Sequence, residues 1–369
     1  MSSKKVILVC NQKNTFVTKD ISLLEQMGYH VFLIYSPAYR DPFRFLWNRL
    51  RELILGIYYL PQSEALFTWF NDYHSLIPIR LAGLFGKSST IIVGGYDAIA
   101  NKSLDYGIFL RNNFRQSIAK TNYIKANSIW VVHKSLSEGC PNSKQEYQTQ
   151  SGIKNFIPKL KTPILEVPTA YNSNFWKSNN VKTKKTVITV ANINDKRTFE
   201  RKGISMFIEL AKLLPDFKFT LAGIKKNLSV YDSIPKNLTI LSKQTRDQLK
   251  DLYGSHSYYF QGSKIEGLPN VLCEAMLCKC IPIGSKVFGI PDVIGSTGLL
   301  FDSKEGLEKI TAFLKKSDAI LFVSSFLSNA IILPSLGNAK AIDNVLKPVK
   351  VPISSTLLML EIFIIKCRN

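Results

Sequence analysis

Short apolar runs alternate along this chain with longer stretches in which apolar residues recur every three or four positions. Residues 5–10 and 29–35 are runs of the first kind, while residues 16–27 have the longer period and end before Gly28. Short runs are typical of buried strands, and the longer period is typical of a helix that packs along one face. Strands and helices in alternation predict a parallel sheet with crossover helices.

The alternation continues in two series. Strands of the first are expected over residues 65–69, 90–93 and 128–132, with a helix over residues 74–85 that Gly86 closes. In the second, after Pro168, strands are expected over residues 186–191, 217–222, 238–241, 258–261 and 281–284, and helices over residues 203–214, 246–253 and 269–278. Gly223 is expected to end the strand over residues 217–222. The two series predict an α/β chain of two Rossmann-like domains that face each other across a cleft.

A chain of 369 residues is longer than one hydrophobic core usually serves, which also favours two domains. The hinge is expected near residues 163–174, beside a Lys- and Asn-rich stretch over residues 177–185. We therefore predict an N-terminal domain over residues 1–168, a C-terminal domain over residues 169–318 and an atypical tail over residues 319–369.

The net charge limits the classes of partner. Lys and Arg together number 48 and Asp and Glu 27, which leaves +21 and attracts polyanions. Anionic lipid headgroups, phosphorylated small molecules and nucleic acid all fit that charge. No basic motif with interleaved aromatic residues matches the known nucleic-acid modules, so we expect no nucleic-acid partner.

Cysteine and histidine spacing gives no metal signature. Cys278 and Cys280 are too close for a Cys-x2-Cys knuckle, and the thiols are expected to be buried and reduced. The apolar run over residues 6–10 is too short for a secretory signal. The apolar run over residues 356–365 is too short to span a membrane and carries Glu361. A cytoplasmic chain is expected.

One segment combines an anion site with two carboxylates: Ser263-Lys-Ile-Glu-Gly-Leu-Pro-Asn-Val-Leu-Cys-Glu-Ala-Met276. Gly267 allows a tight turn after a strand, and Pro269 stands where a helix would begin, at its first position. The free N–H groups of that helix start favour a phosphate. Glu274 suits vicinal hydroxyls such as those of a ribose, and Glu266 suits a sugar hydroxyl. From the residues alone, a surface helix with two unrelated glutamates is an equal alternative.

The same segment resembles the Glu-x7-Glu signature of glycosyltransferase family 4, the group 1 transferases of GT-B fold. The similarity continues through Ile281-Pro-Ile-Gly284, Gly289-Ile-Pro-Asp-Val-Ile-Gly295 and Gly298-Leu-Leu-Phe301. Upstream, Arg201-Lys-Gly203 matches the basic residue before the first helix of the family's C-terminal domain, and residues 168–172 resemble its hinge. Residues 71–74 and 94–97 resemble segments of members that build bacterial surface polysaccharides.

This resemblance implies a donor site for a nucleotide-diphosphate sugar, with no further cofactor. Glu266 would contact the transferred sugar, Glu274 the nucleotide ribose, and Lys202 the diphosphate. The backbone of four residues would line the sugar-diphosphate site: Gly267, Leu268, Pro269 and Asn270.

The second cation of the diphosphate site is open. The family usually has an arginine shortly after the strand over residues 186–191, where this chain reads Asn192-Ile193. Lys196, Arg197 and Arg201 are the candidates, and a solvated basic loop is the alternative interpretation.

The resemblance also implies transfer with retention of anomeric configuration. The departing diphosphate develops negative charge, so fixed cations and helix N–H groups aimed at it lower the barrier. No Asp-x-Asp occurs in the chain, and we predict a metal-independent reaction. Many members place a His near the reacting sugar, but the matching Gly94-Gly-Tyr-Asp97 has none. Asp97 is the candidate there for holding a sugar hydroxyl or the acceptor, with a simple strand-end turn as the alternative.

Residues 40–56 mix four arginines with aromatic and aliphatic residues. A helix of that composition could lie in an anionic membrane interface, and a core helix with a basic edge is the alternative. A lipid-linked acceptor would make such attachment useful.

We therefore predict a retaining glycosyltransferase that moves a hexosyl group to a glycan or lipid-linked acceptor. Its setting would be O-antigen or capsule synthesis, on the inner face of the bacterial cell membrane. The alternatives are a non-catalytic nucleotide-sugar- or glycan-binding protein with a degenerate transferase fold, and a GT-B nucleotide-sugar epimerase. The tail, interrupted by Pro334, Pro348 and Pro352, departs from the family pattern and favours the first alternative.

Overall fold

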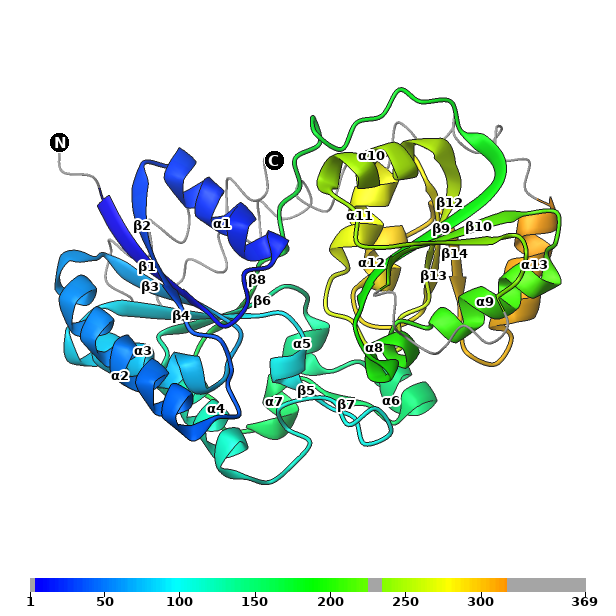
Figure 1. The fold of residues 1–369 in the computed structure, drawn as a ribbon. Helices are drawn as coiled ribbons and strands as arrows, with labels where there is room; N and C mark the ends of the chain where they lie inside the picture. The colour runs from blue at the N-terminus through cyan, green and yellow to red at the C-terminus, as the bar shows by residue number, and fades with distance from the viewer. Residues whose placement is uncertain (1–3, 225–233, 317–369) are drawn as a thin grey trace.

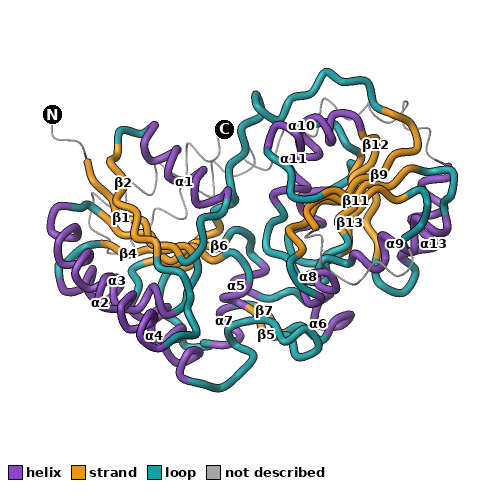
Figure 2. Tube along the Cα trace, in the orientation of Figure 1, coloured by secondary structure: helices purple, strands orange, loops and turns teal. Residues whose placement is uncertain are grey.

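The computed structural model describes residues 4–224 and 234–316, which form two lobes, each built on a six-stranded parallel sheet (Figure 1). The strand order is β2-β1-β3-β4-β6-β8 in the first sheet and β11-β10-β9-β12-β13-β14 in the second. Helices cover the faces of both sheets (Figure 2). The predicted pair of Rossmann-like domains is confirmed.

The first sheet contains every strand that the apolar runs predict there. Its strands are β1 (Lys4–Cys10), β2 (Tyr29–Tyr35), β3 (Ala65–Trp69), β4 (Ser88–Val93), β6 (Ser128–Val131) and β8 (Ile164–Glu166). Its helices are α1 (Thr15–Gln26), α2 (Pro42–Tyr59), α3 (Tyr73–Leu84) and α4 (Phe114–Lys125). The sequence pattern did not predict α4 or β8. Helix α1 lies on one face of this sheet, and α2, α3 and α4 lie on the other (Figure 1).

The second sheet follows the predicted order of elements. Its strands are β9 (Thr183–Ile193), β10 (Lys218–Ile224), β11 (Leu238–Leu241), β12 (His256–Gln261), β13 (Ile281–Ser285) and β14 (Leu299–Phe301). Its helices are α8 (Lys196–Arg201), α9 (Ile204–Leu213), α10 (Arg246–Ser255), α11 (Asn270–Leu277), α12 (Ile290–Ile294) and α13 (Gly306–Lys316).

The expected end of a strand at Gly223 is wrong. Strand β10 continues through this residue, and its pairing with β9 shifts register between Ala222 and Ile224. Gly223 has φ +107°, and a Cβ there would lie 2.2 Å from the carbonyl oxygen of Ala191. Glycine therefore forms a bulge inside the strand rather than a stop.

Smaller elements complete the first lobe. They are the short helical turns η1 (Leu60–Gln62) and η2 (Tyr96–Ala98), the antiparallel pair β5 (Ile99–Ala100) and β7 (Gln150–Ser151), and the short helices α5 (Ser135–Glu138), α6 (Pro141–Tyr147) and α7 (Ile153–Phe156). One apolar cluster includes Val132 and Leu136 of the first lobe together with Ile265 and Phe288 of the second. The two lobes therefore share a buried apolar contact.

The tail, the cysteines and the apolar character of the helices bear on further predictions. The tail over residues 319–369 lies outside the described residues. Five cysteines in the described ranges are buried, as the composition predicts: Cys10, Cys140, Cys273, Cys278 and Cys280. Among the described residues, no helix has the length and apolar character needed to cross a bilayer.

The strand order locates the place for a ligand in the second sheet. The order reverses between β9 and β12, so the chain leaves these two neighbouring strands in opposite directions. At such a reversal a crevice opens beyond the carboxyl ends of the strands. The loops after β9 and β12 are therefore the first candidates to hold a ligand.

Gly203, between α8 and α9, offers a test of how tightly these loops are packed. It has φ +68°, and a Cβ there would lie 2.0 Å from the carbonyl oxygen of Gly262. We expect Gly203→Ala to lower the free energy of unfolding by about 2–4 kcal/mol, since both backbone strain and a clash oppose it. Urea denaturation followed by circular dichroism measures this.

Gly83 in helix α3 provides the matched control. It is exposed, and a Cβ there would meet no atom within 4 Å. We expect Gly83→Ala to be neutral or to stabilise by up to about 1 kcal/mol. Equal unfolding midpoints for the Gly203→Ala variant and the wild type would contradict the packing argument.

Candidate active site at the domain interface

An ion pair joins the two loops at the reversal of the second sheet. Lys202 follows α8, after β9, and its Nζ bonds to Oε2 of Glu266 in the loop after β12. Both side chains are 16% exposed. Burial alone would raise the pKa of Glu266, but Lys202 and Arg201 hold it below its usual value. The pair therefore presents a charged carboxylate and an ammonium at one edge of the crevice.

Arg201 borders the same loop. Its Nη1 donates to the carbonyl oxygen of Ile265 at 3.3 Å, and its guanidinium lies 5.0 Å from the ring centroid of Tyr106 in the first lobe. Arg197 instead bonds the carbonyl oxygen of Asp105 at 3.0 Å. Of the candidates for the second cation, Arg201 is the one whose guanidinium bonds the loop that carries Glu266.

Gly267 brings the first lobe onto the donor loop. A Cβ at this position would lie 2.5 Å from the carbonyl oxygen of Gly94 and 3.0 Å from Cγ2 of Val132. The carbonyl oxygen of Gly267 accepts a bond from the N–H of Gly289 at 3.1 Å. Only glycine fits where three segments of backbone meet, so Glu266 lies next to a close contact between the lobes.

The start of helix α11 carries free donors. Pro269 is its N-cap, with φ −76° and ψ 107°, and not its first helical residue as predicted, because the extended ψ keeps it outside the helix. Among the described residues, the N–H groups of Gly267, Leu268 and Asn270 have no hydrogen-bond acceptor. Free N–H groups at a helix start attract an anion.

The side chain of Asn270 does not point to a ligand. Its Oδ1 accepts hydrogen bonds from the hydroxyls of Thr169 at 2.9 Å and Tyr171 at 2.8 Å, in the segment that joins the lobes. It thus fixes this segment against α11, and only its backbone N–H remains for a phosphate.

Glu274 lies one turn into α11 and meets a lysine of the other lobe. Its Oε1 is 3.5 Å from Nζ of Lys19 on α1, and its side chain is 8% exposed. Burial raises the pKa of Glu274, while Lys19 and Arg246 oppose that rise. Sequence analysis missed Lys19, because no local pattern relates α1 to α11.

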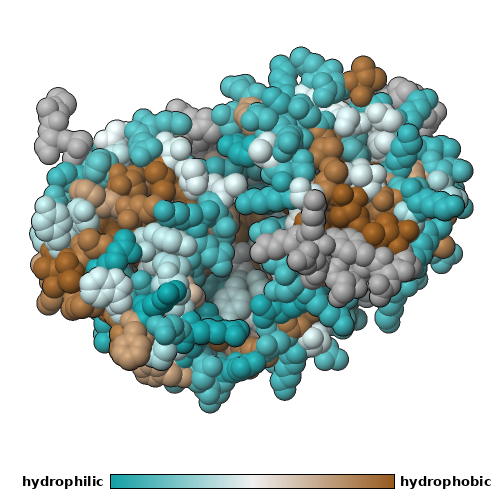
Figure 3. Space-filling model, viewed as in Figure 1, coloured by the Kyte–Doolittle hydropathy of each residue, from teal (hydrophilic) through white to brown (hydrophobic). Residues whose placement is uncertain are grey.

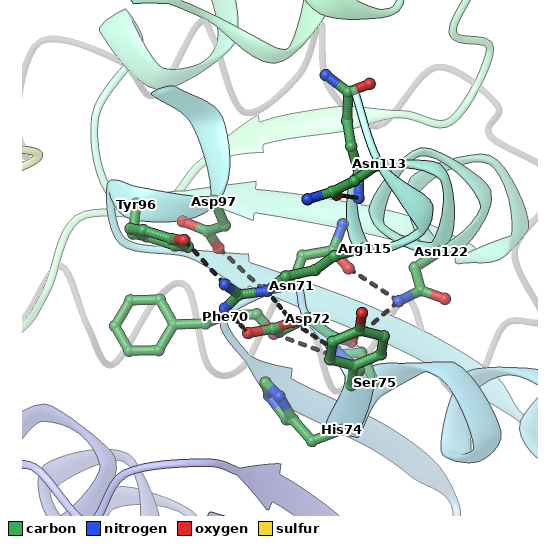
Figure 4. A network of polar contacts seen from close by, with 12 residues as sticks. Phe70, Asn71, Asp72, His74, Ser75, Tyr96, Asp97, Asn113, Arg115 and Asn122 are labelled. Atoms are coloured by element: carbon green, nitrogen blue, oxygen red, sulfur yellow. Dashed lines mark hydrogen bonds and ion pairs between the residues drawn. The ribbon is translucent and has the colours of Figure 1, made fainter. Parts of the chain in front are cut away.

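A polar network fills the carboxyl edge of the first sheet (Figure 4). The guanidinium of Arg115 on α4 bonds both carboxylate oxygens of Asp72, and it also bonds the hydroxyl of Tyr96 at 3.0 Å. Asn122 donates to Oδ1 of Asn71 at 2.9 Å. Burial alone would raise the pKa of Asp72, but its bonds to Arg115 hold it below its usual value. These bonds fix the loops after β3 and β4 to each other.

Asp97 belongs to this network and does not face the crevice. It is fully buried, and its Oδ1 accepts from the N–H of Gly95 and its Oδ2 from that of Asn71, both at 3.1 Å. Burial raises its pKa to about 7. Because the side chain is fully buried and each oxygen accepts a backbone N–H, Asp97 shapes the Gly94–Gly95 turn in this structure. Its predicted contact with a sugar hydroxyl or the acceptor stays a prediction.

Two histidines of the first lobe, His74 and His133, are held by contacts with other protein groups. His74 is buried, and its Nε2 lies 2.9 Å from the carbonyl oxygen of Trp69. His133, after β6, reaches the second lobe, where its Nε2 lies 3.1 Å from Oδ2 of Asp292. Lys134 pairs with the same carboxylate at 2.7 Å. His133 therefore bridges the two lobes.

Sequence comparison finds a family that matches the C-terminal lobe. The family described as "Glycosyl transferases group 1" matches residues 171–321, which include Arg201, Lys202 and the Glu266–Glu274 segment. The C-terminal lobe therefore matches the group 1 glycosyltransferases, which are retaining enzymes that take their sugar from a nucleotide sugar. No curated protein matches the chain significantly in sequence.

Solved structures of the same fold cover most of this glycosyltransferase. Sucrose-phosphate synthase from Thermosynechococcus elongatus aligns with TM-score 0.61 and 14% identity, over 90% of this chain and 98% of that one. The catalytic domain of starch synthase IV from Arabidopsis thaliana, bound to ADP and acarbose, aligns over 100% of both chains with TM-score 0.60 and 12% identity. The pneumococcal O-GlcNAc transferase GtfA, with UDP and GlcNAc, aligns with TM-score 0.54 and 16% identity, over 81% and 61%. At these identities the likeness shows the GT-B fold.

The Lys202–Glu266 pair gives a direct test of the site. We expect Lys202→Met to weaken binding of a nucleoside diphosphate by about tenfold to hundredfold, the usual range for one charge-assisted contact. Isothermal titration calorimetry measures the affinity. Lys212→Met is the matched control, because Lys212 also pairs with a glutamate, Glu209, but on the exposed face of α9. Equal affinities for the Lys202→Met variant and the control would remove Lys202 from the site.

Proposed function

We propose that Glu266, Glu274, Lys202 and Arg201 hold a nucleotide-diphosphate sugar at the β9–β12 reversal. Glu266 binds the transferred sugar, Glu274 the ribose, and the two cations the diphosphate, with the free N–H groups of the α11 start beside them. The juxtaposition of Lys202 and Glu266 carries this proposal, because it places a cation for the leaving group beside an acceptor for the sugar. The ADP and UDP in two structures of similar fold support a nucleoside diphosphate as the leaving group.

The proposed site stabilises the charge that the reaction creates. As the bond from the anomeric carbon to the diphosphate oxygen breaks, negative charge grows on the diphosphate beside Lys202 and Arg201. The acceptor oxygen bonds to the anomeric carbon on the same face, and its proton passes to the departing diphosphate oxygen. Donors and cations that are fixed before the reaction need not reorganise as the charge develops. Such preorganised electrostatic stabilisation is the largest catalytic effect in many enzymes.

The acceptor side is inferred from the surface of helix α2. Eight large apolar side chains of this helix are exposed: Phe43, Leu46, Trp47, Leu50, Leu53, Ile54, Ile57 and Tyr58. Figure 3 shows apolar surface over the lobe that contains α2. Single exposed apolar residues are ordinary, but a continuous apolar helix face marks an interaction site.

The inward side of α2 carries buried polar residues beside Leu55 and Tyr59, which pack against the core. Nδ2 of Asn48 donates to the carbonyl oxygen of Pro37 at 2.8 Å, and Nη2 of Arg49 donates to Oγ of Ser36 at 2.9 Å. Arg49 also pairs with Glu52, which is 1% exposed. These bonds orient the helix with its apolar face outward, which is the reverse of a helix that covers a core.

An anionic membrane surface fits this helix. Arg40 and Arg44 lie exposed at its N-terminal end, and the chain as a whole carries +21. Each basic residue near an anionic leaflet contributes about 1 kcal/mol to attachment. We infer that α2 lies in the interface of the inner face of the cell membrane and that the acceptor is a lipid-linked glycan of O-antigen or capsule synthesis.

Donor turnover tests the enzymatic proposal. Over a panel of nucleotide sugars with a lipid-linked glycan acceptor, we expect release of nucleoside diphosphate for at least one donor, with retained anomeric configuration in the product. Glu274→Ala should lower kcat/KM by about tenfold or more, since a bidentate contact to the ribose is lost. Glu209→Ala, at an exposed helix position, is the control. No release with any donor would favour a non-catalytic binding protein, and interconversion of nucleotide sugars without acceptor would favour an epimerase.

Flotation with liposomes tests the membrane proposal. We expect the protein to float with phosphatidylglycerol vesicles at low salt and to be partly released as salt screens the charges. The double variant Trp47→Glu with Ile54→Glu should stay at the bottom of the density gradient. Both side chains lie on the exposed face of α2, where a carboxylate would oppose insertion into the bilayer interface. Leu213→Glu, also at an exposed apolar position but on α9, should float like the wild type. A wild-type protein that does not float at low salt would contradict the proposal.

A further inference from the structure

Lys19 brings the N-terminal lobe to the nucleoside end of the proposed donor site. It lies on α1, directly after the first strand of the chain, and its Nζ is 3.5 Å from Oε1 of Glu274 on α11. The side chain of Lys19 is 17% exposed and that of Glu274 is 8% exposed. The two lobes are therefore joined here by a largely buried ion pair.

The ammonium of Lys19 is held in place by groups other than Glu274. Its Nζ donates to the carbonyl oxygen of Ala170 at 3.4 Å and lies 4.6 Å from the ring centroid of Tyr171. Both residues belong to the segment that joins the lobes, and Tyr171 is itself fixed by its bond to Asn270. These contacts would keep the Lys19 ammonium in place when a ligand approaches Glu274.

Glu274 retains one oxygen for a ligand. Lys19 faces Oε1, and among the described residues no hydrogen bond reaches Oε2. A buried carboxylate without a cation would be protonated more readily, and a protonated carboxyl loses its charge and part of its acceptor capacity, so it binds hydroxyls less strongly. The cation at Oε1 therefore decides how well Oε2 can bind vicinal hydroxyls.

We propose that Lys19 is a positioning residue of the nucleoside site, which keeps Glu274 charged through one oxygen while the other accepts the ribose hydroxyls. The proposal rests on the proposed role of Glu274 in donor binding. Because Lys19 and Glu274 come from different lobes, the site is complete only when α1 and α11 meet. Nucleotide affinity is thereby coupled to closure of the two lobes.

Besides Lys19, the groups around Glu274 are Arg246 on α10, whose charge also lowers the pKa of Glu274, and a set of tyrosines and cysteines. Burial raises the pKa of each of the remaining neighbours, which therefore stay neutral: Tyr171, Tyr253, Tyr259, Cys273 and Cys278. Burial also raises the pKa of Glu274, and Lys19 is the chief group that lowers it. Removal of Lys19 would therefore shift ionisation of Glu274 to higher pH.

The pH dependence of nucleotide affinity tests this inference. Calorimetry would measure the dissociation constants of UDP, GDP and ADP for the wild type, Lys19→Met and Lys19→Arg. For the nucleotide that the wild type binds best, we expect Lys19→Met to weaken binding at least about tenfold at about pH 5.5 and about threefold or less at about pH 8.5, because the protonated fraction of Glu274 falls as the pH rises. Lys19→Arg, which keeps the charge, should restore most of the affinity at both values. Lys5→Met, at a half-buried lysine of β1 bonded to Gln62 and far in sequence from Glu274, is the control and should behave as the wild type.

The outcomes separate this inference from the proposed function. If the wild type binds a nucleotide and Lys19→Met weakens it equally at both pH values, or not at all, Lys19 does not act through the charge of Glu274 and the inference is overturned. If the wild type binds none of the three nucleotides, both the donor-site proposal and this inference fail. The inference is supported if the ratio of the Lys19→Met dissociation constant to the wild-type one rises toward acid pH and Lys19→Arg abolishes that rise.

Discussion

The ion pair between Lys202 and Glu266 is the constraint on which the donor side of this enzyme depends. A carboxylate removed from water costs several kcal/mol unless a cation and hydrogen bonds accompany it. Here the cation comes from the loop after α8 and the carboxylate from the loop after β12, at the point where the sheet order reverses. The pair therefore holds two loops together and leaves opposite charges at the crevice that a nucleotide sugar would enter.

The first lobe supplies the other wall through backbone and not through an exposed acid. Asp97 and the Asp72–Arg115 pair fix the turns after β4 and β3, and the Gly94 carbonyl then meets the donor loop at Gly267. Such a wall is rigid because its polar groups satisfy one another. The proposed roles of Lys19 and Glu274 add a second contact between the lobes, so donor binding and lobe closure depend on the same side chains.

Helix α2 reverses the usual arrangement of an amphipathic helix. Its polar residues Asn48, Arg49 and Glu52 face inward, and burial raises the pKa of Glu52 to about 7. This arrangement costs stability, because buried polar groups lose hydration while an apolar face stays in water. A membrane interface would cover that face, and this gives the proposed attachment a physical basis within the fold.

The sequence alone determined the two series of strands and helices and the segment from Glu266 to Glu274, because apolar periodicity and turn residues are local properties of the chain. It did not determine α4, β8 or the bulge at Gly223, which depend on pairing with distant strands. Nor could it show that Asp97 turns inward, that Lys19 meets Glu274, or which face of α2 points outward. Periodicity tells that a helix has an apolar face, but only the packing of the other elements decides whether that face is buried or exposed.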